Sequence, residues 1–321
     1  MWVRWDSQWY LHIAAGGYQG VREYAFSPLY PFLIWLFTPE VGSGAMAGLV
    51  LSNVAFLGAL VWLQGLVREE WGVDVARRTT DYLILFPFSF YFSAVYTESL
   101  FLLFTVVSFA AARRRNWMLA GLAGLGASLT RSVGMVLVLP LLYEFWRSRE
   151  RWAKSWRIGL VFVGPAIFAL YQYFREGDPF LFLQAQRIGW DRVTTWPWVG
   201  FVAAFKQMAT HPYPAYSQVI TVLDLSSSLL FLALILWMIF RFPPAYALYS
   251  GAAYLLSVTA PSLGAVSPLL SMSRLVLVLF PAFIVLGVLG KRESVNRLLV
   301  ITAPVIQGCA FAVFSSWHWL A

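Results

Sequence analysis

Long apolar runs alternate with short basic clusters along most of this 321-residue chain. Only 12% of its residues are charged, against about 25% in typical soluble domains. A water-soluble fold of this composition would leave large apolar patches in water, whereas a lipid bilayer solvates them. The pattern therefore predicts an all-α polytopic membrane protein. The excess positive charge lies between the apolar runs, as in the cytoplasmic loops of membrane proteins, and does not indicate a nucleic-acid surface.

A membrane-spanning helix needs about 20 apolar residues, and fewer where the helix is broken or shielded by protein. On this basis the sequence predicts a bundle of about ten transmembrane helices. Their expected ranges are 45–66, 80–95, 98–112, 117–130, 132–147, 158–175, 219–240, 244–262, 274–290 and 297–318. Each neighbouring pair of basic clusters encloses two of these ranges, so all the clusters can lie on the cytoplasmic side at once.

The opposite connections are then expected to face outward. They are residues 1–44, the turns at 96–98 and 130–132, the segment 176–218, and residues 263–273. The first loop opens with a segment too polar to span, and the apolar run that follows contains Pro28 and Pro31, so we expect interfacial helices there. Tryptophans and mixed charges in 176–218 are typical of the headgroup layer.

Four ionisable residues fall on this predicted outward face. Asp6 shares a face of an amphipathic segment with Tyr10. Glu98 and Arg131 lie at turns between apolar runs, and Arg274 opens another span. Such groups are costly near a membrane and are candidate functional residues, although each alone could be a solvated anchor, a helix cap or a snorkelling side chain. Two arginines and two carboxylates at one depth are suited to bind an anionic headgroup beside a general base.

The sequence offers no support for a metal or nucleotide site. No pair among His12, His211 and His318 has the spacing of metal ligands on a helix, so we expect no bound zinc, and another divalent metal is equally unsupported. The glycines of 121–129 lie in a hydrophobic run with no preceding strand, which indicates close helix packing. An enzyme of this kind would take its activated substrate from the membrane.

Several blocks of sequence carry a family resemblance. They are RWDSQWYLHIAAGGY followed by FSPLYPFLI, YTESLFLL at 96–103, LTRSVGMVLVLPLL at 129–142, GDPFLFLQAQRIGW at 177–190 and SMSRLVLVLFP at 271–281. In this order they resemble the PIG-V-type mannosyltransferases, the family of the second mannosyltransferase of GPI-anchor synthesis and its bacterial relatives. The resemblance covers most of the chain.

This resemblance implies a GT-C-type glycosyltransferase that transfers a sugar, typically mannose, from a polyprenyl-phosphate donor to a lipid-linked or glycan acceptor. It implies a multi-pass protein of a bacterial plasma membrane whose active site faces outward. The acidic residue of the family's first outer loop falls on Asp6, which would deprotonate the acceptor hydroxyl as general base.

The remaining site residues are predicted from the needs of this reaction. A departing phosphate needs cationic stabilisation, so Arg131 and Arg274 are the predicted donor-phosphate contacts, with Arg187 and Lys206 as alternatives. The predicted substrate-binding residues are Glu98, Tyr10, Tyr30, Gln186 and Trp190.

We expect residues 1–321 to form a single transmembrane glycosyltransferase domain that lacks one preceding transmembrane helix, because relatives carry such a helix before the Trp-Asp loop. The alternative function is a transporter or flippase for a lipid-linked saccharide, which would also use outward arginines and aromatic residues. A transporter should contain repeats and charges near the midplane, and neither is evident in the sequence. A non-catalytic scaffold, the third candidate, would leave Asp6 and Arg274 replaceable.

Overall fold

The computed structural model describes residues 2–210 and 216–320. Within these ranges the fold is helical, and the only β contact is an isolated bridge between Arg192 and Ser262. The α-helices are α1 (Asp6–Gly16), α2 (Leu29–Val41), α3 (Gly44–Trp71), α4 (Val73–Leu85), α5 (Glu98–Arg113), α6 (Trp117–Thr130), α7 (Val138–Arg147), α8 (Trp156–Glu176), α9 (Leu181–Trp190), α10 (Val199–Thr210), α11 (Tyr216–Arg241), α12 (Pro244–Val258), α13 (Met272–Leu275), α14 (Phe280–Leu289) and α15 (Glu293–Ser315). Short 3-10 helices are η1 (Val21–Ala25), η2 (Ser89–Ser93), η3 (Ser132–Leu137), η4 (Trp152–Lys154) and η5 (Val276–Val278). The predicted all-α architecture is confirmed.

Four segments of the described chain are long and apolar enough to cross a membrane. They are α3, α11, α15 and the segment Trp152–Glu176, which contains α8. A fifth candidate is a broken span, Met272–Val278 followed by Phe280–Leu289, with a bend of 83° between its two parts. The chain is a multi-pass membrane protein. The predicted count of about ten transmembrane helices is not confirmed, because most of the other helices are shorter than a bilayer-spanning helix.

Two further predicted spans are also interrupted. In the range 80–95, α4 ends at Leu85 because Phe86 has an extended ψ of 142°. Phe86 precedes Pro87, and a residue before proline is disfavoured in the helical region. The range 132–147 divides into η3 and α7. Sequence hydropathy located the apolar segments but did not resolve these breaks.

The glycines of α6 allow a neighbouring helix to approach closely. A Cβ atom at Gly121 would overlap the carbonyl oxygen of Arg157 in α8, and one at Gly124 would lie 2.6 Å from Cγ2 of Val161. A larger residue at either position would force the two helices apart. The predicted close helix packing at 121–129 is confirmed.

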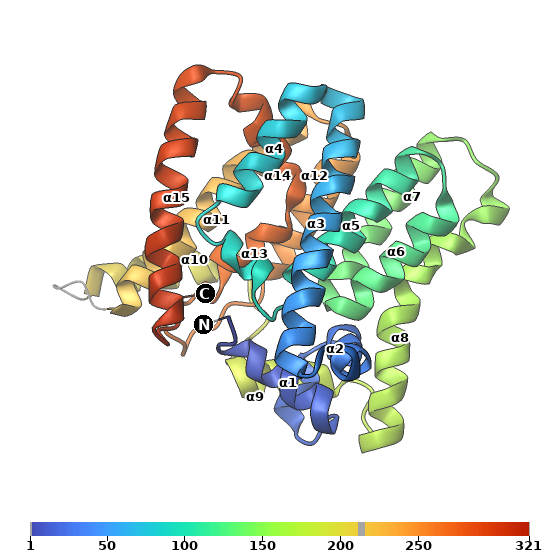
Figure 1. The fold of residues 1–321 in the computed structure, drawn as a ribbon, viewed down its shortest axis with the longest axis vertical. Helices are drawn as coiled ribbons and strands as arrows, with labels where there is room; N and C mark the ends of the chain where they lie inside the picture. The colour runs from blue at the N-terminus through green and yellow to red at the C-terminus, as the bar shows by residue number, and fades with distance from the viewer. Residues whose placement is uncertain (1, 211–215, 321) are drawn as a thin grey trace.

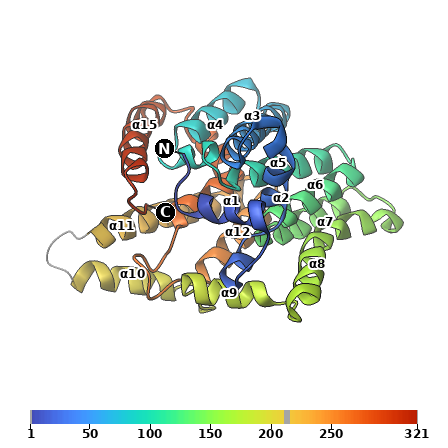
Figure 2. The same cartoon turned by 60° about the horizontal axis from the view of Figure 1, so that its bottom comes forward.

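Two basic connections lie at one end of the helix bundle. In Figure 1 the α3–α4 and α14–α15 connections lie at the upper end, whereas α1, α2 and α9 lie at the lower end. Arg68, Arg77 and Arg78 flank the first of these connections, and Lys291 and Arg292 lie in the second. Figure 2, in which the lower end comes forward, shows α1 beside α2 and above α9. These two basic clusters therefore lie away from the end that carries α1.

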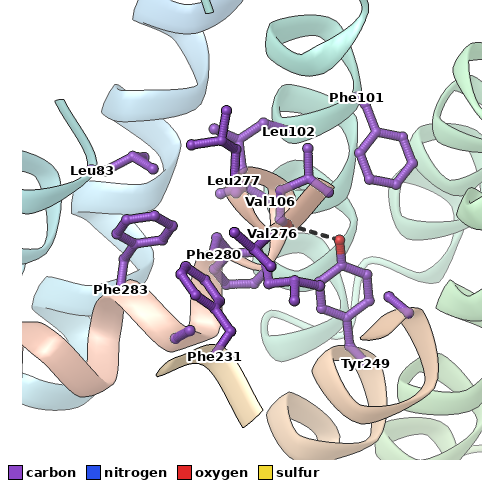
Figure 3. Packing of buried hydrophobic residues seen from close by; sticks show 14 of the residues in the cluster. Leu83, Phe101, Leu102, Val106, Phe231, Tyr249, Val276, Leu277, Phe280 and Phe283 are labelled. Carbon is purple, nitrogen blue, oxygen red and sulfur yellow. Dashed lines mark hydrogen bonds between the residues drawn. The ribbon is translucent and has the colours of Figure 1, made fainter. Parts of the chain in front are cut away.

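The hydrophobic core packs against the bent segment, residues 272–289. Figure 3 shows Phe101, Leu102 and Val106 of α5 packed near Val276 and Leu277 of η5. The hydroxyl of Tyr249 in α12 donates a hydrogen bond of 3.0 Å to the carbonyl of Val278, next to the bend. The bend is thus fixed by buried packing and by one buried hydrogen bond, and it holds α13 inside the bundle.

Candidate active site

Two carboxylates and two guanidinium groups form one ion cluster, which we call the site cluster (Asp6, Glu98, Arg131 and Arg274). Nη1 of Arg274 donates a hydrogen bond of 2.7 Å to Oδ2 of Asp6. Nη1 of Arg131 lies 2.6 Å from Oε1 of Glu98, and Nε of Arg274 lies 3.6 Å from the same oxygen. The structure brings together the four ionisable residues that the sequence analysis placed on one face.

Helix ends position three of these charges. Asp6 and Glu98 are the first residues of α1 and α5, and Arg131 directly follows α6. The helix dipole favours a negative charge at an N-terminus and a positive charge at a C-terminus. Each of these groups therefore lies where the backbone stabilises its charge.

An unusual backbone conformation precedes both partners of the central ion pair. Trp5, which precedes Asp6, has a φ of 50°, and Ser271, which caps the helix of Arg274, has a φ of 66°. Both φ angles are positive, which residues other than glycine rarely adopt. Strained residues of this kind cluster at functional sites, where the surrounding structure compensates for them.

The cluster lies in an aromatic and largely buried environment. The guanidinium carbon of Arg274 lies 5.6 Å from the ring centroid of Tyr91 and 5.2 Å from that of Tyr96, within the range of cation–π attraction. Glu98 is 1% exposed and Arg274 is 8% exposed. Electrostatic interactions in such a site are stronger than in water.

Some atoms of the site cluster have bonding capacity to spare. Among the residues that the structure describes, Oε2 of Glu98 and Nε of Arg274 are buried without a hydrogen-bond partner. Arg274 is also the only side chain in these ranges that donates to Asp6, and it uses one of the two carboxylate oxygens. Buried polar groups in proteins are normally satisfied. These atoms can therefore contact a hydroxyl or an anion that enters the site.

Tyr10 extends the cluster through a hydroxyl relay. Its hydroxyl lies 3.3 Å from Oγ1 of Thr97, and the same Oγ1 accepts a 3.3 Å hydrogen bond from Arg131. Burial, and next the negative charge of Glu98, raises the pKa of Tyr10 above its ordinary value of 10.0. The phenol therefore stays neutral at physiological pH and can serve as a hydrogen-bond donor.

The other predicted substrate-binding residues surround α1 without joining the site cluster. Tyr30 is fully buried, its ring lies 5.2 Å from that of Tyr10, and its hydroxyl contacts Oγ of Ser52 at 2.6 Å. Gln186 donates a 3.4 Å hydrogen bond to the backbone carbonyl of Ala25 in η1. The ring of Trp190 packs against that of Phe26. In the described ranges no hydrogen bond or ion pair links these three residues to the four charges. Their substrate-binding roles stay predictions.

Asp224 is a buried acidic residue that the sequence analysis did not single out. It lies in α11, is 0% exposed, and its Oδ1 accepts hydrogen bonds from the backbone N–H and the hydroxyl of Ser273, at 3.0 and 2.8 Å. Ser273 is adjacent to Arg274, so Asp224 fixes the helix that carries this arginine. A lone aspartate within an apolar run was the available signal.

Arg192 is a second residue that was not predicted. It follows α9, and its guanidinium donates to the backbone carbonyls of Ala260 and Leu270, at 3.0 and 3.2 Å. Burial, followed by the positive charges of Arg274 and Arg131, lowers its pKa to about 10. Its available signal was its position, two residues after the GDPFLFLQAQRIGW block.

The two alternative donor-phosphate contacts of segment 176–218 lie on the surface, unlike the residues of the site cluster. Arg187 and Lys206 are exposed on α9 and α10. As for metals, no group of three or more His, Cys, Asp or Glu residues that could hold an ion occurs among the described residues. His211 lies outside them.

The N-terminal part of the chain, which holds three of the four charges, matches a known family. Residues 2–142 match the family model described as Mannosyltransferase (PIG-V). This part of the chain, somewhat less than half of it, is similar to the PIG-V mannosyltransferases. The resemblance predicted from the sequence is confirmed, and the PIG-V-like part includes Asp6, Glu98 and Arg131.

Curated relatives are also named as mannosyltransferases. The chain is 28% identical over 152 residues to GPI mannosyltransferase 2 of Cryptococcus neoformans, which is 44% of this chain and 36% of the relative. It is 27% identical over 179 residues to GPI mannosyltransferase 2 of Yarrowia lipolytica, which is 53% of this chain and 48% of the relative. The matched regions thus span less than half of each relative.

The fold extends the likeness beyond the PIG-V-like part. ArnT from Cupriavidus metallidurans, solved bound to undecaprenyl phosphate, matches with a TM-score of 0.57 and 16% identity, covering 95% of this chain and 58% of ArnT. Its apo structure matches with a TM-score of 0.59 and 15% identity over the same shares. The predicted GT-C-like fold is confirmed by this likeness.

Proposed function

We propose that this protein is a membrane glycosyltransferase that transfers mannose from a polyprenyl-phosphate donor to a hydroxyl of a lipid-linked or glycan acceptor. The observation that carries the proposal is the buried Asp6–Arg274 pair within a cluster whose N-terminal members lie in the PIG-V-like part. The likeness to ArnT, which binds undecaprenyl phosphate, supports a lipid-phosphate donor.

The proposed reaction is a displacement at the anomeric carbon. The acceptor oxygen forms a bond to this carbon while the bond from the carbon to the phosphate oxygen breaks. Oδ1 of Asp6 takes the hydroxyl proton, and its other oxygen stays hydrogen-bonded to Arg274. The bonding electron pair leaves with the polyprenyl phosphate. Arg131 and Arg274 keep unused N–H groups with which to contact the departing phosphate.

We further propose that the site faces outward from a bacterial plasma membrane. The α3–α4 and α14–α15 connections, which carry basic clusters, lie at the opposite end of the bundle from α1 (Figure 1). Positive loops are retained on the cytoplasmic side. The helices α1, α2 and α9 would then lie at the outer headgroup layer, where a lipid-linked donor is available.

The proposed function is tested by measuring transfer of radiolabelled mannose from polyprenyl-phosphate mannose by the purified protein. Asp6→Asn should lower the transfer rate by about 10²- to 10⁴-fold, as expected for loss of a general base. Asp81→Asn, an exposed aspartate of α4, is the matched control and should transfer normally.

Normal transfer by a correctly folded Asp6→Asn protein would exclude Asp6 as the base. Lack of transfer by the wild type with any lipid-linked sugar tested, together with lipid translocation in vesicles, would instead identify a flippase.

A further inference from the structure

Arg192 lies in an extended segment, residues 192–195, that pairs with residues 259–262, which precede α13. Arg192 pairs with Ser262 in an isolated antiparallel bridge, and the N–H of Val193 donates to the carbonyl of Pro261 at 3.2 Å. The N–H of Thr195 continues this pattern with a bond of 2.8 Å to the carbonyl of Thr259. Main-chain hydrogen bonds therefore fix where the Arg192 side chain starts.

The guanidinium group is fixed as well. Nη1 of Arg192 donates to the carbonyl of Ala260, and Nη2 donates to the carbonyl of Leu270. Leu270 directly precedes Ser271, the cap of the helix that carries Arg274. The segment 270–271 thus orients Arg192 and supports the helix of Arg274. The relative positions of the two guanidinium groups are therefore fixed.

Arg192 differs from the two predicted phosphate contacts in its counter-charge. Arg131 and Arg274 each pair with a carboxylate of the site cluster. No carboxylate in the described ranges forms an ion pair with Arg192, whose partners are neutral carbonyls. Burial disfavours its charge most, the positive charges of Arg274 and Arg131 add to this effect, and Asp6 and Asp224 offset part of it. Binding an anion would relieve this repulsion, whereas the charges of Arg131 and Arg274 are already balanced by carboxylates.

We propose that Arg192 is the principal contact of the donor phosphate, with its guanidinium oriented in advance by the carbonyls of Ala260 and Leu270. The inference rests on the proposed function, because it assigns a residue to the lipid-phosphate donor of that reaction. Negative charge on the phosphate increases as its bond to the sugar breaks, and Arg192 stabilises this charge without transferring a proton. Arg274 then serves mainly to hold Asp6.

The test measures binding of two lipids of equal chain length, undecaprenyl phosphate and undecaprenol, to the purified protein in detergent. Arg192→Gln should weaken binding of the phosphate by about 10- to 100-fold, the loss of one charged hydrogen-bonding partner, and leave binding of the alcohol unchanged. Arg192→Lys should restore part of the phosphate affinity. Arg175→Gln, an exposed arginine of α8, is the matched control and should bind like the wild type.

Unchanged phosphate binding by Arg192→Gln would overturn the inference and leave the proposed function standing. Equal weakening of both lipids would overturn it too, since that result indicates a structural role. A wild-type protein that does not prefer the phosphate to the alcohol would contradict the proposed donor itself. In transfer assays the variant should raise the donor KM more than it lowers kcat, a split that misfolding does not produce.

Discussion

Two ion clusters of similar composition lie at opposite ends of this bundle. The far cluster (Glu70, Arg113, Glu144 and Tyr246) joins the ends of α3 and α5 to α7 and α12. Nε of Arg113 lies 2.6 Å from Oε1 of Glu70, and its Nη1 lies 3.0 Å from Oε1 of Glu144. The hydroxyl of Tyr246 donates to the same oxygen of Glu70 at 2.9 Å. Like the site cluster, it combines two carboxylates with arginine.

The clusters differ in how completely their groups are paired. In the far cluster one arginine bridges both carboxylates, and none of its side-chain atoms is a buried group without a partner. In the site cluster two such atoms remain, on Glu98 and Arg274. Taking charges out of water is costly, and incomplete pairing increases that cost. The far cluster therefore ties helices together, whereas the site cluster retains groups that a substrate can use.

The largest difference between the clusters should appear in stability. Glu98→Ala removes the carboxylate of Arg131 and should destabilise the protein by about 3–5 kcal/mol, because a buried charge loses its counter-charge. Glu144→Ala leaves Arg113 paired with Glu70 and should cost about 1 kcal/mol. Denaturant unfolding in detergent measures both values. Equal losses would show that the two clusters contribute alike.

Activity should separate the two arginines. Arg274→Ala removes the hydrogen bond to Asp6 and one cation of the site, so transfer should fall by about 100-fold. Arg113→Ala should lower the yield of folded protein and leave the rate per folded molecule near that of the wild type. Mannose transfer with varied donor concentration, normalised to folded protein, tests this. A similar rate loss in both variants would mean that the far cluster also affects catalysis at the site cluster.

The smallest difference concerns the two tyrosine hydroxyls. Tyr10→Phe and Tyr246→Phe each remove one hydrogen-bonding group and should each cost about 1 kcal/mol of stability. Only Tyr10→Phe should slow transfer, by a few-fold. Because the pKa of Tyr10 is raised above 10.0, its phenol is protonated at every pH below that value. The ratio of wild-type to variant rates should therefore be constant across the neutral range, and a ratio that falls as pH rises through neutrality would contradict this.

The location of the site was predictable from the sequence, and its internal contacts were not. Asp6, Glu98, Arg131 and Arg274 could be assigned to one face because the order of apolar runs and basic clusters fixes the side of each connection. Hydropathy carries no information on which carboxylate pairs with which arginine. The pairing of Asp6 with Arg274 depends on how α13 is held by packing around the bend.

The missed residues have similar explanations. Asp224 lies in a run apolar enough to be taken as an uninterrupted span, and its partner Ser273 is distant in sequence. Arg192 is defined by backbone carbonyls, which every residue possesses and no sequence pattern reveals. The hydroxyl of Tyr30 is bonded within the core, a contact that the sequence did not reveal, and its substrate-binding role stays a prediction. Side-chain type alone does not determine which way a residue faces.

The hydrogen bond between Arg274 and Asp6 joins residues 268 positions apart. Chains are made and inserted from the N-terminus, so most of this protein must leave the ribosome before Asp6 meets its partner. A product that stops before α13 would contain the entire PIG-V-like part and still lack the arginine that orients its carboxylate. If Asp6 acts as proposed, completion of synthesis is a condition for activity, and interrupted translation products released into the membrane should be inert.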